Sequence, residues 1–330
     1  METGTSYLGL RLEHPFVAGA SPFGYHLDTI KRLEDAGCAA IVLHSLFEEQ
    51  ITYADAGHVA HLNIYEQDSR DALSVFPAPD DYPLTPDAYA EHIHRVKQAV
   101  RIPVIGSLNG RTGEAWLKFA RVIAQAGADA IELNIYDVPA DLSASSAAIE
   151  DQIVTVMTDV KRLVAVPVAI KLSPFFTAFG HLARRLDAAG ADGLVLFNRF
   201  YQPDIDVRAM AITTHAELSS SAELLLRLRW TAILHGRIRP SIAISGGIAT
   251  PDDGIKALLA GADAVQLVSA LLRHGPGYVA HMRQALERWM AWHHFERLDE
   301  CRGALSLRKT ADRSSFERGQ YIRALHSWSA

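Results

Sequence analysis

The most regular feature of the sequence is an alternation of amphipathic segments with short apolar runs. Four segments repeat one pattern, in which an amphipathic stretch ends at a glycine and an apolar run follows: AGCAAIVL from Ala36, AGADAIEL from Ala126, AGADGLVL from Ala189 and AGADAVQL from Ala260. Glycine commonly follows the last turn of a helix, and a short apolar run is typical of a buried strand. The pattern therefore predicts a helix followed by a strand four times.

A second pattern alternates with the first, and in it a proline precedes the apolar run. It occurs as RIPVIGSLNG from Arg101, AVPVAIKLSP from Ala165 and RPSIAISGG from Arg239, and PFVAGASP from Pro15 opens the series. Together the two patterns predict eight strands alternating with helices, which is typical of a parallel (β/α)₈ TIM barrel in the α/β class. A doubly wound open sheet has fewer strands and fits this count less well.

The chain is expected to form a single barrel domain over residues 1–330 with two long insertions. One insertion covers about residues 47–85 after the second strand, and the other covers about residues 200–221 after the sixth. Both would lie at the carboxyl ends of the strands, where long loops commonly build or cover an active site. A polar extension over about residues 294–330 would pack on the barrel or meet a partner.

Composition narrows the class of protein. About half of the 330 residues are apolar and the formal net charge is −6, so a large core is expected and a nucleic-acid partner is disfavoured. Two cysteines cannot make a disulfide framework, and neither they nor the histidines have a metal-ligand spacing. Cys38 is interpreted as a buried structural thiol. The first residues lack a secretory pattern and no apolar run is long enough to cross a membrane, so a cytoplasmic protein is expected.

Polar residues follow most of the predicted strands. In a parallel barrel the chemistry gathers at the carboxyl ends of the strands. There the sequence has Gly19, Ala20 and Ser21; His44 and Ser45; Asn109; Asn134; Lys171 and Ser173; Asn198 and Arg199; Ser245, Gly246 and Gly247; and Ser269. Because side chains alternate along a strand, Asn134 and Lys171 are expected at similar heights in adjacent strands.

The SGGIATPDD stretch is a predicted junction between a strand and a helix. Loops after the last two strands of a barrel often bind phosphate through backbone N–H groups, so Gly246 and Gly247 are candidates for that role, with Ser269 adding a hydroxyl. The alternative is that the two glycines only make a tight turn.

Lys171 is the other candidate for chemistry. If it is buried in the barrel mouth it needs an anionic partner. Three interpretations stay open: an imine-forming lysine as in aldolases, a cation held against an electron-rich cofactor, or an ion pair with Glu132 inside the barrel. The sequence shows no G-x-S-x-G elbow and no Cys-His arrangement of a hydrolase.

Taken together, several stretches give the sequence a resemblance to a known family. These stretches are IELN, VAIKLSP, LVLFN and ISGGIATPDDGIKALLAGADAVQL, and the resemblance runs from HPFVAGASP to VQLVSALLRHGP. The chain resembles the FMN-dependent dihydroorotate dehydrogenases, and more closely a divergent branch described as dihydroorotate dehydrogenase-like. The resemblance implies an FMN cofactor, hydride transfer from dihydroorotate to the flavin, and a place in pyrimidine biosynthesis.

The resemblance also implies roles for individual residues. Ala18 to Ser21 would lie along the flavin ring, and Lys171 would stabilise negative charge on the reduced flavin. Asn134 and Asn198 would lie between flavin and substrate. The full cofactor-binding set expected on this basis is Ala18, Gly19, Ala20, Ser21, His44, Ser45, Asn109, Asn134, Lys171, Asn198, Ser245, Gly246, Gly247 and Ser269.

The sequence departs from the family on the substrate side. The family's loop after strand four supplies a cysteine or serine base, whereas NIYDVP stands here, so Asp137 or Tyr136 becomes the candidate base. His44 replaces a lysine, FPAP from Phe76 lacks an asparagine, and Arg199 replaces a small hydroxyl residue. Arg199 and His44 would favour a small anionic substrate, bound with Asn134 and Asn198.

Three functions therefore remain to be compared. The first is an FMN-dependent oxidoreductase acting on dihydroorotate or a related anion. The second is a cofactor-free lyase or aldolase that uses Lys171, and the third is a non-catalytic protein that binds FMN or a metabolite. The sequence leaves the electron acceptor unknown, and a homodimer is expected from the resemblance.

Overall fold

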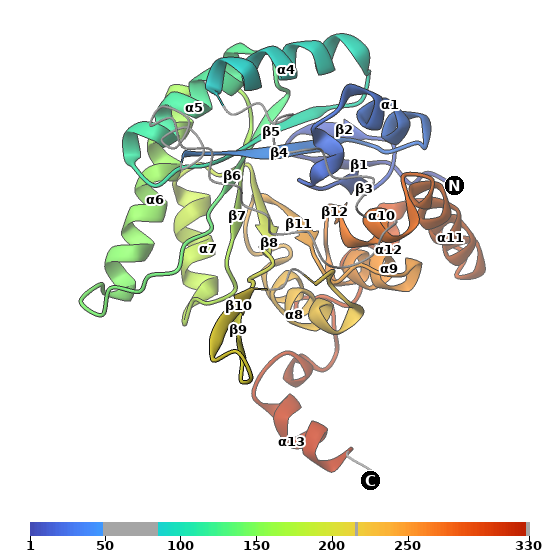
Figure 1. Cartoon of the computed structure of the whole chain (residues 1–330). Helices are drawn as coiled ribbons and strands as arrows, with labels where there is room; N and C mark the ends of the chain where they lie inside the picture. The colour runs from blue at the N-terminus through green and yellow to red at the C-terminus, as the bar shows by residue number, and fades with distance from the viewer. Residues whose placement is uncertain (49–84, 215–216, 328–330) are drawn as a thin grey trace.

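The computed structural model describes residues 1–48, 85–214 and 217–327. Its centre is a closed barrel of eight parallel strands, in the spatial order β11, β12, β3, β4, β5, β6, β7, β8 (Figure 1). The strands are β3 (Phe16–Ala18), β4 (Ile41–Phe47), β5 (Val104–Asn109), β6 (Ala130–Asn134), β7 (Val168–Leu172), β8 (Gly193–Leu196), β11 (Ser241–Ser245) and β12 (Ala264–Leu267). Each of the eight predicted runs forms one of them, so the predicted (β/α)₈ barrel is confirmed.

Helices surround the barrel and bury one face against its outer surface (Figure 1). They are α1 (Leu27–Asp35), α4 (Pro86–Ala99), α5 (Gly113–Gln125), α6 (Ser146–Leu163), α7 (Phe179–Ala188), α8 (Leu224–Leu234), α9 (Pro251–Ala260), α10 (Ser269–His274) and α11 (Tyr278–Trp292). The four glycines of the repeated pattern, Gly37, Gly127, Gly190 and Gly261, all have φ between 82° and 117°. They end their helices as predicted, because this region of φ suits a residue without Cβ.

The aspartate of the repeated AGAD pattern has one structural role in all three places. The carboxylates of Asp129, Asp192 and Asp263 accept the backbone N–H of Val104, Val168 and Ile242 at 2.7, 2.7 and 2.8 Å. Each of these bonds ties the start of one strand to the start of its neighbour. The repeat therefore holds the amino end of the barrel together.

In the first repeat Ala39 stands where the other repeats have aspartate, and Cys38 precedes it. The Cys38 Sγ accepts the backbone N–H of Ala18 at 3.1 Å, so the neighbouring thiol supplies an acceptor for a backbone N–H in this repeat. Burial raises the pKa of Cys38 to about 12. The thiol is therefore unreactive, as its interpretation as a structural residue requires.

Asp192→Ala is expected to lower the free energy of unfolding by about 1.5–3 kcal/mol, because it removes a charged acceptor from the Val168 N–H and from Lys161. Urea unfolding followed by circular dichroism measures the change. Asp159→Ala is the control, since that side chain is 43% exposed and pairs with Arg162 at 3.6 Å on the surface of α6. Equal losses in both variants would contradict the role given to the repeat.

A short N-terminal hairpin closes the amino end of the barrel. It consists of β1 (Thr5–Tyr7) and β2 (Leu10–Leu12), and it buries Tyr7, Leu8 and Leu12 against the small inward-facing residues of the barrel strands. This hairpin has no counterpart among the predicted elements. Because one end is filled in this way, only the carboxyl ends of the strands are left to form a site.

The predicted insertions and extension differ in what the structure describes. The first insertion lies almost entirely outside the described residues, from 49 to 84. The second contains an antiparallel hairpin of β9 (Pro203–Asp206) and β10 (Ala211–Thr214), followed by the short helix η3 (Ser221–Glu223). The C-terminal extension contains α12 (Leu298–Cys301), η4 (Arg313–Ser315) and α13 (Gly319–His326). In the described part of the chain, none of the helices has the length and apolar character needed to cross a membrane.

Candidate functional site

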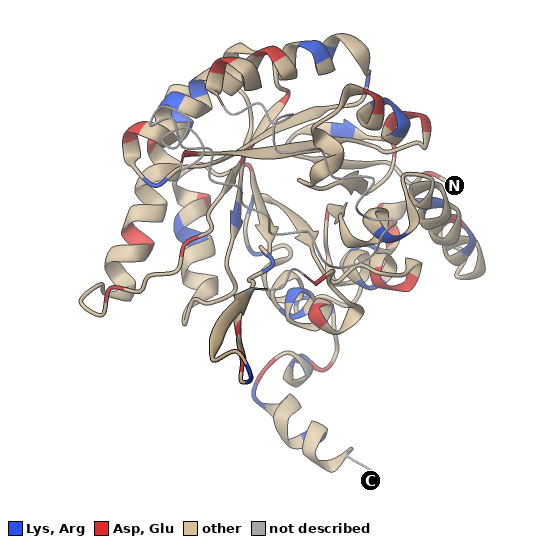
Figure 2. Cartoon of the chain, viewed as in Figure 1, with Lys and Arg blue, Asp and Glu red and all other residues tan. Residues whose placement is uncertain are grey.

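Charged side chains lie mainly on the helices and loops, while the barrel strands are nearly free of them (Figure 2). The exceptions among the inward-facing strand residues are Glu132 and Lys171. Lys171 pairs with Asn134 in the register of β6 and β7, so the predicted equal height of these two side chains is confirmed. Lys171 is 7% exposed and Glu132 is completely buried.

Lys171 and Glu132 form an ion pair, with Nζ 3.5 Å from Oε1. Gln266 donates its side-chain N–H to the other carboxylate oxygen at 2.6 Å. Burial, and after it the negative charge of Glu132, raise the pKa of Tyr7 below this group. The ion pair considered from the sequence is therefore present. Lys171, Glu132, Gln266 and Tyr7 form a row of polar side chains inside the barrel, and Lys171 lies at its end nearest the carboxyl ends of the strands.

Amide side chains join the strand ends beside Lys171. Asn109 donates to the carbonyl of Asn134 at 2.7 Å, and Asn198 donates to the carbonyl of Ile135 at 2.8 Å. Both bonds fix the chain where it leaves β6. Asn134 in turn donates to Ser45 Oγ at 3.2 Å, and Ser45 is hydrogen-bonded to Ser107 at 2.7 Å. The structure thus joins four of the predicted cofactor-binding residues in one hydrogen-bond network at the ends of β4, β5, β6 and β8. They are Ser45, Asn109, Asn134 and Asn198.

The side-chain oxygen of Asn134 is buried and has no hydrogen-bond partner among the described residues. A buried acceptor without a donor is costly. Since the amide nitrogen is already used by Ser45, the free oxygen is suited to accept an N–H from a ligand in the barrel mouth.

A second group of predicted residues lies at the ends of β11 and β12. Gly246 and Gly247 have φ of 80° and 79°. A Cβ on Gly246 would lie 2.8 Å from the Arg227 guanidinium, and one on Gly247 would lie 2.5 Å from the backbone nitrogen of Leu224. Both positions therefore require glycine, and the backbone passes directly under the start of α8.

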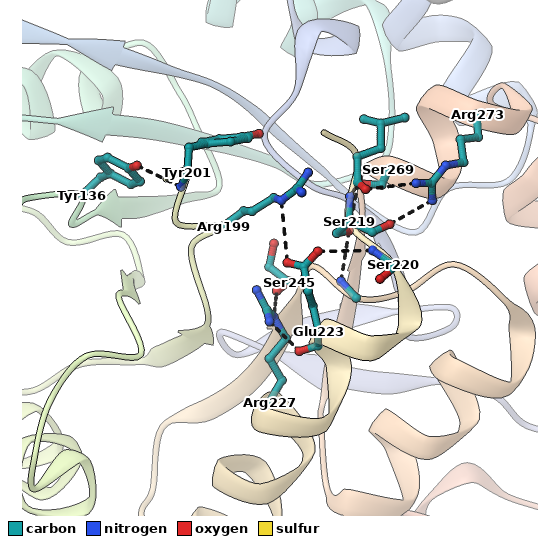
Figure 3. A network of polar contacts seen from close by, with 12 residues as sticks. Tyr136, Arg199, Tyr201, Ser219, Ser220, Glu223, Arg227, Ser245, Ser269 and Arg273 are labelled. Atoms are coloured by element: carbon teal, nitrogen blue, oxygen red, sulfur yellow. Dashed lines mark hydrogen bonds and ion pairs between the residues drawn. The ribbon is translucent and has the colours of Figure 1, made fainter. Parts of the chain in front are cut away.

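Ser219 joins this second group, although the sequence analysis did not single it out. Its hydroxyl accepts the Gly247 N–H at 3.1 Å and is hydrogen-bonded to Ser269 at 2.9 Å (Figure 3). Arg273 fixes this segment by donating to the carbonyl of Ser219 at 2.9 Å. The run of serines from 219 to 221 was the available signal, but nothing local in the sequence shows that it returns to the glycine pair.

Ser245 anchors the same region from below. Its carbonyl accepts Arg227 Nε at 2.5 Å, and another nitrogen of Arg227 donates to the carbonyl of Glu223 at 2.7 Å (Figure 3). Arg227 is 5% exposed. It therefore ties the end of β11 to the start of α8 and holds the glycine pair in place.

The predicted flavin loop, residues 18–21, lies at the mouth next to β12. Gly19 donates its N–H to the carbonyl of Leu267 at 3.0 Å. A Cβ at Gly19 would come within 2.8 Å of Val268 and 3.2 Å of Gln266. The loop thus lies close to the strand end that leads into Ser269.

The ring of His44 lies apart from these groups. The pairing of β4 with β5 shifts by one residue between Val42 and Ser45, so Ser45 faces inward and His44 does not. The His44 ring instead contacts Tyr25, Tyr89 and His92, at centroid distances of 4.2, 5.1 and 5.8 Å.

Burial lowers the pKa of His44 to about 3, and the charge of His92 acts in the same direction. Its imidazole is therefore neutral at physiological pH. The expectation that His44 attracts an anion is corrected for this reason, since a neutral ring supplies no positive charge.

The protein is expected to become less stable as the pH is lowered, because its buried histidines are protonated more readily in the unfolded chain than in the folded one. Because the folded-state pKa of His44 is below the usual 6.5, the unfolded chain takes up a proton that the folded chain does not between about pH 6.5 and 3. The expected contribution of this residue is up to about 1.4 kcal/mol per pH unit. Urea unfolding at pH 7.5 and 5.5 should show a smaller pH dependence for His44→Gln. His94→Gln, on the exposed side of α4, should keep the wild-type dependence.

The candidate base and the candidate anion-binding residue lie on the loops after β6 and β8. The Tyr136 hydroxyl accepts the backbone N–H of Tyr201 at 3.3 Å (Figure 3). The Tyr136 ring stacks on Phe200 at a centroid distance of 4.9 Å. Asp137 is exposed. Arg199 packs over the Tyr201 ring at 5.2 Å and lies 3.7 Å from the Glu223 carboxylate. The positive charge of Arg199 is thus partly balanced by the carboxylate of Glu223, which precedes α8 near Gly247.

Metal ligands do not gather anywhere in residues 1–48, 85–214 and 217–327, where no group of three or more His, Cys, Asp or Glu side chains is placed to hold an ion. The polar residues that converge are amides, serines, glycines and one lysine. Such a set is suited to hydrogen-bonding an organic cofactor or substrate rather than to coordinating a metal.

Comparison with known proteins identifies the family. The family model for dihydroorotate dehydrogenase matches residues 86–290. The catalytic subunit of dihydroorotate dehydrogenase B (NAD(+)) from Thermoplasma volcanium is 27% identical over 311 residues, which are 92% of this chain and 98% of that protein. A putative dihydroorotate dehydrogenase A (fumarate) from Aeropyrum pernix is 25% identical over 317 residues, 92% of this chain and 97% of that one. With these matches, the chain belongs to the dihydroorotate dehydrogenase family.

Proposed function

We propose that this chain is an FMN-dependent oxidoreductase that removes hydride from a CH–CH bond of dihydroorotate, or of another small anion, in pyrimidine biosynthesis. As a member of its family it is a dehydrogenase acting on CH–CH groups, and the family is one of flavoproteins. Bound FMN would supply the hydride acceptor.

One observation carries the proposal. The unpartnered amide oxygen of Asn134 lies beside the cationic Lys171, at the carboxyl ends of adjacent strands. An electron-rich heterocycle with ring N–H groups is complementary to this pair, because the amide oxygen accepts an N–H and the ammonium balances negative charge. Asn109, Asn198 and Ser45 hold the Asn134 segment in that orientation.

The phosphate of the cofactor would be held by Gly246, Gly247 and Ser269, with Ser245 below them. Ser219 is added to this group because its hydroxyl already satisfies the Gly247 N–H and contacts Ser269. These groups hydrogen-bond to one another, so a phosphate oxygen would replace the Ser219 hydroxyl as the acceptor of the Gly247 N–H and accept from the Ser269 hydroxyl. The donors present therefore suit a phosphate group as well as the flavin ring.

The lyase alternative is less well supported by the site. A lysine that forms an imine reacts as the neutral amine, whereas Lys171 is ion-paired with Glu132. The amide network around Asn134 would also have no role in such a reaction.

The first test is the absorbance spectrum of the purified protein. Bound flavin gives a yellow protein, and anaerobic addition of dihydroorotate should bleach it if dihydroorotate is the substrate. A protein that is colourless and stays so after incubation with FMN would overturn the proposal. A yellow protein that dihydroorotate does not bleach directs the search to other small anions. NAD(+) and fumarate, the acceptors in the names of the relatives, are then compared as oxidants.

Tyr136 is the better candidate for the base because the Tyr201 N–H holds its hydroxyl in place, whereas Asp137 is exposed. Tyr136→Phe is expected to slow flavin reduction by roughly 100-fold or more. Asp137→Asn should leave the rate nearly unchanged, since that side chain is exposed. Anaerobic stopped-flow measurement of flavin bleaching distinguishes the two, and the reverse order of effects would assign the role to Asp137.

A further inference from the structure

Arg227, in the first turn of α8, is a buried cation that forms no ion pair with a carboxylate in the described part of the chain. The residue is 5% exposed, and two of its nitrogens donate to the backbone carbonyls of Ser245 and Glu223. The carboxylate of Glu223 lies 3.7 Å from Arg199 instead. A carbonyl carries no net charge, so the guanidinium is buried without a counter-charge in direct contact, which is energetically unfavourable.

Lys171 offers a comparison, because it and Arg227 are the two buried residues among the lysines and arginines that the structure describes. Lys171 has its counter-charge in Glu132, at 3.5 Å. For Arg227, burial lowers the pKa of the guanidinium, the carboxylate of Glu223 opposes this shift, and the charge of Arg199 adds to it. Arginine keeps its proton in proteins, so the buried charge persists. An anion from outside the chain would stabilise it.

One nitrogen of Arg227 is left over, and it lies against the glycine pair. Nε and Nη1 donate to Ser245 and Glu223, whereas Nη2 has no hydrogen-bond partner among the described residues (Figure 3). A Cβ on Gly246 would lie 2.8 Å from Nη2 and 3.2 Å from Cζ. The guanidinium comes this close to the backbone only because position 246 has no side chain. The unused N–H groups of Nη2 are therefore next to the proposed phosphate site.

The carboxylates in the segments that flank the glycine pair do not compensate Arg227. Glu223 lies 3.7 Å from Arg199, and Asp253 lies 3.7 Å from Lys256. The amino end of α8, under which the glycine pair passes, adds further positive potential. The region is thus short of negative charge, and a phosphate group, which carries about −1.5 to −2 at neutral pH, matches the deficit.

We propose that Arg227 is the counter-charge of the cofactor's phosphate group, and that it makes this chain select a phosphorylated flavin over the same flavin without phosphate. The inference rests on the proposed function and deepens it. Gly246, Gly247 and Ser269 supply neutral donors to the phosphate, whereas Arg227 supplies a charged one, and charge-assisted hydrogen bonds are about twice as strong. Because two backbone carbonyls already hold the guanidinium, little side-chain freedom is lost on binding.

The ratio of two dissociation constants tests this role. Riboflavin is FMN without the phosphate, and flavin fluorescence gives the affinity of the flavin-free protein for each of them. Arg227→Gln removes the charge but keeps an amide donor, and the preference for FMN over riboflavin should fall roughly 10- to 100-fold. A purely structural role would weaken the binding of both flavins alike and leave the ratio unchanged. The wild-type ratio in Arg227→Gln would therefore overturn the proposal.

Two further variants complete the comparison. Arg229→Met is the matched control, because Arg229 is an exposed arginine of the same helix that donates to Gln320, and it should keep the wild-type ratio. Arg227→Lys keeps the charge but loses the planar fork of donors, so its ratio should lie between those of the wild type and Arg227→Gln. If the neutral variant does not fold, the wild-type ratio in Arg227→Lys counts against the proposal in its place.

Failure of the proposed function gives a different result from failure of this inference. A wild-type protein that binds FMN and riboflavin equally well remains a flavoprotein, but Arg227 then has no role toward phosphate. A wild-type protein that binds neither flavin contradicts the proposed function, and calorimetry with inorganic phosphate then tests Arg227 by itself. Phosphate binding that is lost in Arg227→Gln supports the counter-charge, whereas no binding to the wild type, or equal binding to both proteins, overturns it.

Discussion

Lys171→Met is expected to slow flavin reduction by roughly 100- to 1,000-fold, because it removes the only cation that faces the Asn134 amide in the described barrel strands. The same change leaves Glu132 buried without a counter-charge. Loss of one partner of a buried pair costs about 3–5 kcal/mol, so the variant should also unfold at a much lower urea concentration. Stopped-flow reduction and urea unfolding measure the two effects.

A double variant separates the two effects. In Lys171→Met with Glu132→Gln, no buried charge is left, and the new amide can still accept the Gln266 N–H. Most of the lost stability should return, because neutral replacement of a buried ion pair is often tolerated, while flavin reduction should stay slow. If the double variant recovers both properties, the lysine has no direct role in the chemistry.

Gly247→Ala is expected to weaken FMN binding by more than about tenfold and to destabilise the protein by at least about 2 kcal/mol. The φ of 79° is unfavourable for a residue with Cβ. The added methyl would also lie 2.5 Å from the Leu224 nitrogen and 2.7 Å from its Cα, which are backbone atoms that cannot move aside freely. The Gly247 N–H that contacts Ser219 would be displaced as a result.

Flavin fluorescence gives the dissociation constant, and thermal unfolding with and without FMN gives the stability. Gly113→Ala at the start of α5 is the control, since a Cβ there meets nothing within 4 Å. That substitution should be neutral or slightly stabilising. Unchanged FMN affinity in Gly247→Ala would remove the glycine pair from the cofactor site.

The barrel was predictable because its signals are local. A glycine that ends a helix and an apolar run that follows it depend on neighbouring residues only, and the eight strands formed where these patterns occur. The equal height of Asn134 and Lys171 followed from side-chain alternation alone. Even the outlier in the repeat, Cys38, could be interpreted as structural from its position, and its contact with Ala18 gives the reason.

The parts of the site that the sequence did not predict depend on contacts between distant residues. Ser219 reaches Gly247 and Ser269 across 28 and 50 positions, and no periodicity marks it. The interpretation of Lys171 was left open because the ion pair with Glu132 and a role toward a cofactor use the same geometry. His44 was misjudged for another reason, since nothing in the sequence marks the shift in the pairing of β4 with β5 that turns its ring away from the mouth.

Because of that shift, the first and last residues of β4 follow different alternations of inward-facing and outward-facing side chains. From Val42 to Ser45 the strand uses one residue more than its neighbour β5. Without this irregularity, strict alternation from Val42 would turn His44 toward the mouth and Ser45 away, so the extra residue is what keeps Ser45 opposite Ser107. At this place the irregular pairing, rather than the identity of the residues, decides which side chain faces the mouth of the barrel.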